Sequence, residues 1–547
     1  MNINTRIKLK VNTFSFCLVA VSIMAWSAAA PAAESLPSKL NKWETADFVF
    51  ETKSISKNPF DTEITALFTN TSSGKTYRSS LFYNADNQYV SRVSLPESGE
   101  WRYKLESSLS DLNGRVGSVQ VGSATSRGKV MIDKDTRKTF LYENGEIYNP
   151  QAYELDWLFS LDQTNNTLTQ TKSIINYIKN GGFNQVLINV YAYGSSNKNS
   201  WATKDLDPKY NFNKTKIFPF LGTNEQPDYS ALNVDYFKKL DEKIAYLNQQ
   251  GIEAHLMIYV WNKGVNWPDL GSKEELRYFN YVINRYSGYN NIIWDISKEA
   301  MDYNHANAQF INDRIDIIRK LDPRDHLITL HDFIYAESPY LASKLDYISI
   351  QEWAPDIAKK TDDLNKLHPD KPVHNIENGC YETTTHRIFS GAFNSAEACL
   401  DRNYQIYFNG AYTTHYWQNT SWFELNFEPQ ILPEKQQPNM TYQKVFSEFM
   451  NAYPLKSWKP HRFHFATWAL INDKQDIVFY LPADADGVKG HLTPEYNKLK
   501  FKRTWLSMHT GKRVDGGEWD MKGYEWIDGN KPDELIGQPA VLILTHE

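Results

Sequence analysis

The chain has 547 residues and a formal net charge of −6, with ordinary Gly and Pro counts. This length allows three or four domains of about 150 residues each, and the composition excludes collagen-like and disordered chains. Because the charge balance is mildly acidic, we expect no nucleic-acid partner. The 14% aromatic content suits packed cores as well as sugar-stacking surfaces.

Residues 1–33 are predicted to be a signal peptide. Three basic residues in the first ten precede an apolar run over 14–26, and small residues follow as far as Ala33. The apolar run is too short for a spanning helix. We therefore expect cleavage near Ala32 or Ala33, export to the periplasm or the cell exterior, and no membrane span.

Cys380 and Cys399 are the cysteines that remain after this cleavage. An exported chain enters a compartment that permits disulfides. A disulfide between the two cysteines would close the loop that separates them. Two unpaired buried thiols are the alternative. We predict that the two cysteines form a disulfide.

Residues 42–125 are predicted to form an N-terminal Ig-like β-sandwich. Short alternating runs are separated there by Gly, Pro and Asn turn signals, a spacing typical of small antiparallel sandwiches. The predicted strands are 48–52, 64–68, 89–93, 101–105 and 117–121.

Residues 135–455 change to strands that alternate with amphipathic helices. The predicted strands are 147–153, 185–191, 254–260, 291–296, 326–330, 347–350, 373–376 and 412–416. Eight consecutive units of this kind favour a (β/α)8 TIM barrel over an open sheet. No Gly-rich phosphate loop follows any strand, which argues against a dinucleotide site.

Residues 460–547 return to alternating runs and predict a C-terminal β-sandwich. The runs are 463–468, 476–481, 499–502, 504–508 and 540–544. The predicted fold is therefore a TIM barrel flanked by two β-sandwich domains.

Two glutamates follow barrel strands at the rim where barrel enzymes place their active groups. Glu299 lies just past the fourth predicted strand and Glu377 just past the seventh. Glycosidic cleavage needs such a pair, because one carboxyl protonates the departing oxygen while the other attacks the sugar carbon. Each glutamate taken alone has an alternative role in a helix cap or a surface ion pair.

Several segments resemble the apiosidase-like glycoside hydrolase barrels. They are Ala-Tyr-Glu-Leu-Asp-Trp at 152–157, Asn-Val-Tyr-Ala-Tyr-Gly at 189–194, Asn-Val-Asp-Tyr-Phe at 233–237 and Lys-Pro-Val-His-Asn-Ile-Glu-Asn-Gly-Cys-Tyr-Glu at 371–382. Those barrels often follow a small sandwich domain of unknown function and often carry a C-terminal sandwich. The resemblance implies a retaining glycosidase with Glu299 as the acid/base and Glu377 as the nucleophile.

Lys298 departs from the pattern that this resemblance implies. In the broader superfamily of such barrels an Asn usually precedes the acid/base and holds the sugar 2-hydroxyl, whereas this chain has Lys298. An ammonium there would pair with a sulfate or carboxylate on the substrate. Alternatively, Lys298 points away from the substrate or lowers the pKa of a neighbouring carboxylate.

Further rim positions are candidates for substrate contacts, each with a structural role as the alternative. They are Glu154, Trp157, Asn189, Tyr191, Trp261, Lys298, His331, Gln351, Glu352, Tyr416 and Trp417. Glu352 is the strongest competitor for a catalytic carboxylate. Trp201, Trp261, Trp417 and Trp422 are the indoles placed on the predicted cleft rim, three of them within the long connections at 194–233 and 417–439.

The sequence predicts no cofactor and no metal, because it has no H-E-x-x-H motif and no Cys/His cluster with ligand spacing. We expect an exported retaining glycoside hydrolase acting on a plant or algal polysaccharide or its oligosaccharides, with an anionic substrate as one option. The alternatives are a non-catalytic carbohydrate-binding protein on a degenerate barrel and a polysaccharide lyase that uses Lys298, His331 and Tyr416. The oligomeric state stays open.

Overall fold

The computed structural model describes residues 36–546 except 55, 166, 195–206, 214, 383–391, 422, 465, 493–494, 497 and 522–525. The predicted signal peptide, Trp201 and Trp422 lie outside the described residues. Within the described part, no helix is both long enough and apolar enough to cross a membrane.

The N-terminal part forms two β-sheets around one hydrophobic core, which confirms the predicted sandwich. Its strands are β1 (Lys39–Lys42), β2 (Thr45–Glu51), β3 (Ile64–Asn70), β4 (Thr76–Ser80), β5 (Phe82–Tyr83), β6 (Gln88–Ser94), β7 (Gly99–Ser107) and β8 (Val116–Ala124). One sheet has the order β1-β8-β7-β3-β4 and the other β2-β6-β5, and Phe48, Phe68 and Trp101 fill the space between them. The sandwich is not purely antiparallel, because β1 pairs with β8 in parallel.

A small three-stranded sheet links this part to the barrel. It consists of β9 (Val130–Ile132), β10 (Phe140–Tyr142) and β11 (Ile147–Tyr148). The sequence predicts one strand over 147–153, whereas the structure has two, β11 and the first barrel strand β12 (Gln151–Glu154). Pro150 lies between them and has no N–H to donate to a ladder, so the run is interrupted there.

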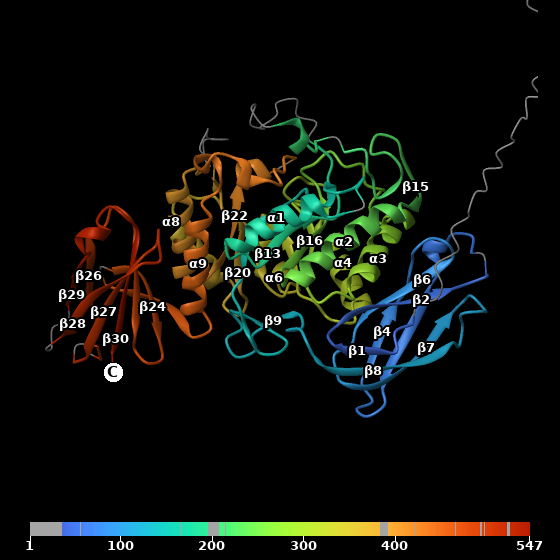
Figure 1. The fold of residues 1–547 in the computed structure, drawn as a ribbon, viewed down its shortest axis with the longest axis horizontal. Coiled ribbons are helices and arrows are strands. Elements are labelled where there is room, and N and C mark those ends of the chain that lie inside the picture. The colour runs from blue at the N-terminus through green and yellow to red at the C-terminus, as the bar shows by residue number, and fades with distance from the viewer. Residues whose placement is uncertain are drawn as a thin grey trace, which may run out of the picture. The chain divides into compact units, whose positions relative to one another are not determined.

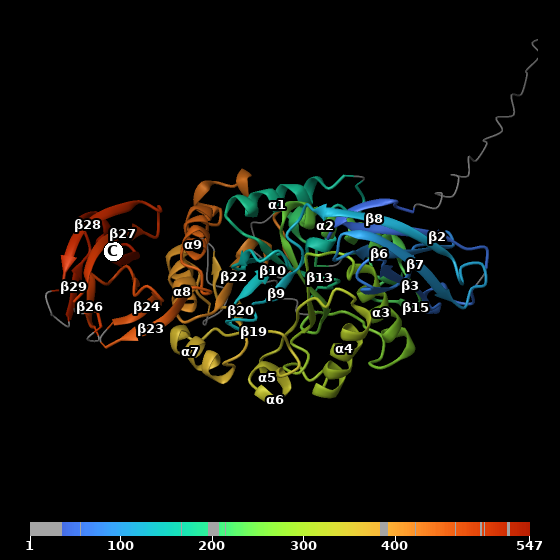
Figure 2. The ribbon, with the colours of Figure 1, turned by 90° about the horizontal axis from the view of Figure 1, so that it is seen from below.

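Eight parallel strands form the predicted barrel, in the order β18-β17-β16-β13-β12-β22-β20-β19 (Figures 1 and 2). They are β12, β13 (Gln185–Asn189), β16 (Glu253–Val260), β17 (Ile292–Lys298), β18 (Ile328–His331), β19 (Ile348–Gln351), β20 (Val373–Glu377) and β22 (Tyr412–Trp417). Between β18 and β19, the Thr329 hydroxyl donates to the Ser349 hydroxyl at 2.9 Å. A short strand, β21 (Tyr381–Glu382), pairs with β22 beside this sheet.

Helices surround these strands (Figure 2). They are α1 (Thr169–Asn180), α2 (Val234–Gln250), α3 (Lys273–Tyr286), α4 (Ala308–Leu321), α5 (Phe333–Ala336), α6 (Pro339–Ala342), α7 (Ile357–Leu367), α8 (Ala396–Phe408) and α9 (Met440–Ala452). In α2 the side chain of Asn233 accepts from the Tyr236 N–H at the start, and Gly251 ends the helix with a left-handed φ of 68°. Its buried face includes Phe237, Leu240 and Ile244, as the sequence period predicts.

The long connection at 194–233 contains a hairpin that the sequence analysis does not predict. Its strands are β14 (Phe220–Gly222) and β15 (Pro227–Leu232). The connection also joins the loop after β22, because the Phe212 N–H donates to the Phe423 carbonyl at 2.8 Å and the Tyr210 and Phe427 rings lie 5.0 Å apart. Tyr210, Phe218 and Phe220 are buried, so these aromatic residues pack the loops together.

The C-terminal part is β-rich, as predicted. Its strands are β23 (Trp458–Phe463), β24 (Ala466–Asn472), β25 (Ile477–Leu481), β26 (Gly487–His491), β27 (Lys500–Ser507), β28 (Arg513–Asp520), β29 (Trp526–Asn530) and β30 (Ala540–His546). They form a six-stranded sheet, β23-β24-β25-β30-β27-β28, and a two-stranded sheet, β26-β29. The runs predicted at 499–502 and 504–508 belong to one strand, because the break between Arg503 and Thr504 is a register shift and not a turn.

The N-terminal sandwich is joined to barrel helices α2 and α3 by buried arginines. Arg92 on β6 donates to Asp47 at 2.7 Å and to Asp241 on α2 at 3.0 Å, and Arg285 on α3 donates to Asp241 at 2.7 Å. Burial alone would raise the pKa of Asp241, but Arg285 and Arg92 hold it below its usual value. Because residues Glu34–Glu547 form one compact unit, the predicted domain boundaries stay predictions.

We expect Asp241→Asn to destabilise the protein by about 3–5 kcal/mol, because two buried guanidinium groups lose their shared carboxylate. The matched control is Asp47→Asn: the Asp47 side chain is 38% exposed, and Arg92 keeps Asp241, so the loss should stay below about 1 kcal/mol. Urea unfolding at pH 7 measures both. Equal losses in the two variants would contradict the central role of Asp241.

Candidate active site

Ionisable side chains gather at the carboxyl ends of the barrel strands. They are Glu154 and Asp156 at and after the end of β12, Lys263 after β16, Lys298 and Glu299 at the end of β17, His331 on β18 and Glu377 on β20. All of them except Lys263 are buried, so water screens their charges only weakly. The sequence analysis identifies five of these residues and misses Asp156 and Lys263.

Lys298 is the buried cation at the centre of this group. Its Nζ atom lies 3.2 Å from an oxygen of Glu377, 3.7 Å from Asp156 and 3.8 Å from Glu154. Burial alone would lower the pKa of Lys298, but Asp156, Glu377 and Glu154 together hold it well above its usual value. Lys298 is therefore protonated at neutral pH.

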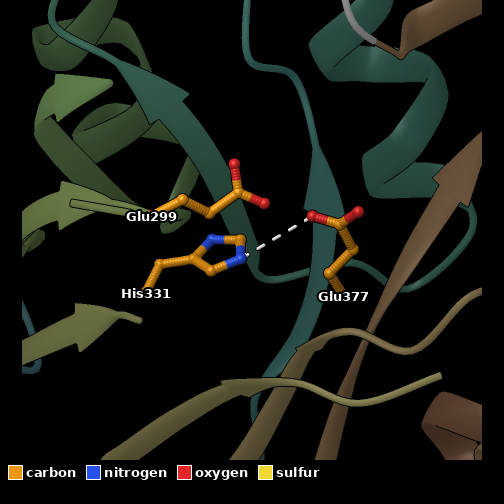
Figure 3. A group of neighbouring side chains, drawn as sticks. All are labelled: Glu299, His331 and Glu377. Atoms are coloured by element: carbon orange, nitrogen blue, oxygen red, sulfur yellow. Dashed lines mark ion pairs between the residues drawn. The ribbon is translucent and has the colours of Figure 1, made fainter. Parts of the chain in front are cut away.

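Glu377 is surrounded by two hydrogen-bond donors, a lysine and a histidine. The Tyr381 hydroxyl donates to Oε1 at 2.6 Å and the Gln351 amide donates to the same oxygen at 3.2 Å, while Lys298 approaches Oε2. His331 Nε2 lies 3.6 Å from Oε2, as the dashed line in Figure 3 marks. The two donors on Oε1 and the ammonium of Lys298 beside Oε2 fix the orientation of the carboxyl group.

His331 is neutral in this site. Burial, reinforced by Lys298, lowers its pKa to about 3. Because the Gln351 amide nitrogen donates to Glu377, the Gln351 oxygen is left to accept from His331 Nε2, which lies 3.1 Å away. This contact places the His331 proton on Nε2 and leaves Nδ1 without a partner among the described residues.

Glu299 reaches the same space from a strained backbone. Its φ is +60°, in the left-handed region that side chains other than Gly rarely adopt. The ladder between β17 and β18 shifts register between Asp295 and Lys298, and Asp295 Oδ1 accepts from the N–H groups of Ser297 at 3.1 Å and His331 at 3.2 Å. This bulge redirects Glu299 at the end of its strand.

The carboxyl of Glu299 lies close to that of Glu377. One oxygen of each and a ring nitrogen of His331 all lie within 4.8 Å of one another, and Figure 3 shows the three side chains pointing toward one another. Burial and the charge of Glu377 raise the pKa of Glu299 to about 7, against the opposing effect of Lys298. The two neighbouring glutamates therefore have different environments, the condition for different roles in acid/base chemistry.

Glu299, His331 and Glu377 also have the composition of a metal site. However, the charged Lys298 lies 3.2 Å from the Glu377 oxygen that would face a cation. An ammonium fixed at that distance would repel a divalent ion. The arrangement suits proton transfer and nucleophilic attack better than metal binding.

A cavity of about 320 Å³ opens beside Glu299. It is lined by Glu299, Asp302, Phe333, Gln351 and Trp353. Trp353 packs close to Gly379, which has a φ of +79°, and a Cβ atom there would lie 2.9 Å from the indole. The cavity is of a size that ligand sites use, and aromatic side chains form part of its wall.

Several buried polar atoms near the barrel mouth have no hydrogen-bond partner among the described residues. Among the described residues, no hydrogen bond is made by the indole N–H of Trp157 or Trp261, the side-chain amide of Asn189, or the hydroxyls of Tyr191 and Tyr416. Buried polar groups need partners. The hydroxyls of a bound sugar, or water in its absence, would supply them.

Three of the remaining predicted residues have structural contacts. The carboxylate of Glu352 accepts from the Ala354 N–H at 2.7 Å and shapes the loop after β19. Trp417 is 1% exposed and packs in the hydrophobic core, while Trp261 is half-buried and stacks on His305 with 5.3 Å between ring centroids. Their contacts with a substrate stay predictions.

Cys380 and Cys399 form a disulfide, with 5.5 Å between their Cα atoms. The bridge begins three residues after Glu377 and ends on α8. Arg402, also on α8, donates to the Asn378 carbonyl at 2.7 Å. The segment that follows Glu377 is therefore tied to α8 at two points.

Asp156, Lys263, Asp302, Trp353 and Tyr381 were not predicted. Asp156 and Tyr381 do lie in segments that carry the family resemblance, Ala-Tyr-Glu-Leu-Asp-Trp and Glu-Asn-Gly-Cys-Tyr-Glu. Their positions in these segments are the sequence signal from which they could have been predicted. Lys263, Asp302 and Trp353 lie on loops with no comparable pattern.

The sequence matches two families of known domains. Residues 157–459 match the apiosidase-like catalytic domain, and residues 39–108 match a domain of unknown function, DUF5060. No curated protein matches the chain.

Solved structures share the fold. A putative glycoside hydrolase from Bacteroides vulgatus superposes with a TM-score of 0.72 at 21% identity, covering 93% of this chain and 100% of that one. A family 5 glycoside hydrolase from the same organism has a TM-score of 0.56 at 17% identity, covering 77% and 93% of the two chains. The apiosidase-like match extends over more than half of the chain, so the protein belongs to the apiosidase-like family and is a glycoside hydrolase.

Proposed function

We propose that the protein is an exported retaining glycosidase in which Glu299 is the acid/base and Glu377 is the nucleophile. The observation that carries this proposal is the approach of the two carboxyls, with oxygens within 4.8 Å. Retaining glycosidases separate their carboxyls by about 5–5.5 Å, whereas inverting enzymes need about 6.5–9.5 Å to admit a water.

The contacts suit a double displacement. In the first step Glu299 gives its proton to the departing oxygen, the glycosidic bond breaks, and Glu377 bonds to the anomeric carbon. In the second step Glu299 takes a proton from a water, which attacks that carbon and releases Glu377. Because the charge of Glu377 raises the pKa of Glu299, loss of that charge in the glycosyl-enzyme turns Glu299 from an acid into a base.

The substrate that we propose is a plant or algal polysaccharide or its oligosaccharides. The unpartnered polar atoms of Asn189, Tyr191 and Tyr416 suit a ring with several hydroxyls. The anionic option loses support, because three carboxyls already surround Lys298. Export is consistent with the Cys380–Cys399 disulfide, since such bridges persist in oxidising compartments.

A screen for new reducing ends tests the activity directly. The purified protein is incubated with a panel of plant and algal polysaccharides and their oligosaccharides, and product anomers are followed by NMR. Release with retained configuration is expected. Binding without release would favour a non-catalytic carbohydrate-binding protein, and an inverted product would exclude the double displacement.

On the substrate found in that screen, we expect Glu377→Gln to lower kcat/KM by about 10³-fold or more, because the nucleophile is lost. Azide should rescue Glu377→Gly by taking the place of the missing carboxylate. The same anion should not rescue Glu352→Gly, the competing carboxylate. Glu337→Gln, on an exposed residue, is the control and should retain full activity.

We expect Glu299→Gln to stabilise the protein at pH 8 while it lowers activity. The folded pKa of Glu299 is about 7, against a reference value of 4.5, so the wild type loses stability between these two pH values as the unfolded state ionises. Gln does not ionise, and the variant should gain up to about 3 kcal/mol above pH 7. The gain should vanish below pH 4.5.

Urea unfolding from pH 4 to pH 8 measures this gain. Glu337→Gln is again the control, and its difference from the wild type should not vary with pH. A pH-independent effect of Glu299→Gln would show that Glu299 does not hold a proton in the folded protein.

A further inference from the structure

We propose that Lys298 is a positioning residue, whose buried ammonium holds Glu377 as an oriented carboxylate and offers no charge to the substrate. The sugar that binds next to Lys298 is then uncharged. This inference rests on the proposed function of Glu377, and it replaces the anionic contact that the sequence suggests.

The ammonium of Lys298 is buried among carboxyls. Its side chain is 4% exposed and has three acidic neighbours, of which Glu377 at 3.2 Å is the nearest. Lys298 is also the last residue of β17 and pairs with Val260 on one side and His331 on the other. The ladder therefore fixes the start of the side chain, and the carboxyls fix its end.

The charge balance of the site supports the same conclusion. Four carboxyls, from Glu154, Asp156, Glu299 and Glu377, face two lysines, Lys298 and Lys263. The two lysines already have carboxyl partners, so the site offers no surplus positive charge to a sulfate or uronate. Removing Lys298 would take away the cation nearest to Glu377 and leave Lys263 as the remaining positive charge beside Asp156 and Glu154.

Most strand ends around Lys298 contribute a titratable group. They are Glu154 and Asp156 from β12, Lys263 after β16, Glu299 and Tyr303 after β17, His331 from β18, Glu377 from β20, Tyr381 from β21 and Tyr416 from β22. Burial raises the pKa of Tyr381 and Tyr416 well above the usual value, so both hydroxyls keep their protons. Lys298 lowers the pKa values of Glu154, Glu299, His331 and Lys263, so these are the groups that respond to its removal.

The first experiment needs no substrate. Lys298→Met should lower Tm by about 5 °C at pH 8, because the unpaired buried carboxylates repel one another. At pH 5 the loss should be smaller, because loss of Lys298 raises the folded pKa values of the carboxyls and they are protonated there. Lys344→Met removes an exposed lysine paired with Asp316 and is the control, with little change at either pH.

A double-mutant cycle assigns the interaction to Glu377. The cycle compares the stabilities of Lys298→Met, Glu377→Gln and the double variant at pH 8. The double variant should lose less stability than the sum of the losses in the two single variants. Lys298→Arg keeps the charge and should stay near the wild type. The positioning role would be overturned if the stability losses of the two single variants were additive, or if the stability loss in Lys298→Met did not vary with pH.

The second experiment uses the glycan from the activity screen. In Lys298→Met, both limbs of the pH profile of kcat/KM should move to higher pH by about one unit, because Glu377 and Glu299 both lose a nearby positive charge. Lys298→Arg should keep the wild-type limbs. A purely structural role would lower kcat without moving them.

A direct anionic contact would give another pattern. Lys298→Met would then raise KM for sulfated or uronate-containing glycans alone, and this result would overturn the inference. If the wild type cleaves no glycan in the screen but the stability cycle shows coupling, the proposed function of Glu377 fails while the electrostatic role of Lys298 stands.

Discussion

The site depends on one buried interaction, the ammonium of Lys298 among the carboxyls of Glu377, Asp156 and Glu154. Three carboxyls in one dry space would each resist ionisation. One fixed cation, 3.2 Å from Glu377, allows the nearest of them to stay a carboxylate. Glu299 lies further from the ammonium of Lys298, and its pKa is raised to about 7. The position of Lys298 thus gives the two glutamates different electrostatic surroundings.

The barrel was largely predictable from the sequence because its signals are local. The strand-and-helix period, the Asn233 cap and the Gly251 stop all act within a few residues of chain. The same local signals fail at Pro150, which splits one predicted strand, and at β14–β15, where a hairpin is read as loop. Both errors concern strands of two to six residues, which are too short to show a clear alternating pattern.

The site was only partly predictable, because its chemistry comes from contacts between strands far apart in sequence. Glu299 and Glu377 are found from their places after barrel strands. By contrast, the charge state of Lys298 depends on Asp156 and Glu154, which precede it by more than a hundred residues. The left-handed backbone of Glu299 also has no sequence signal, since it follows from a register shift between β17 and β18.

Neighbouring residues of the fold hold Glu299 in its left-handed backbone conformation. A left-handed non-glycine residue costs about 1–3 kcal/mol and persists only where its neighbours fix it. Asp295 holds the bulge before Glu299, and the Asp332 carboxylate accepts from the Met301 N–H at 2.7 Å just after it. Both aspartates are buried and neither lies in the carboxyl pair. They stabilise a backbone that the strand would otherwise not adopt, and so they help to position the carboxyl of Glu299.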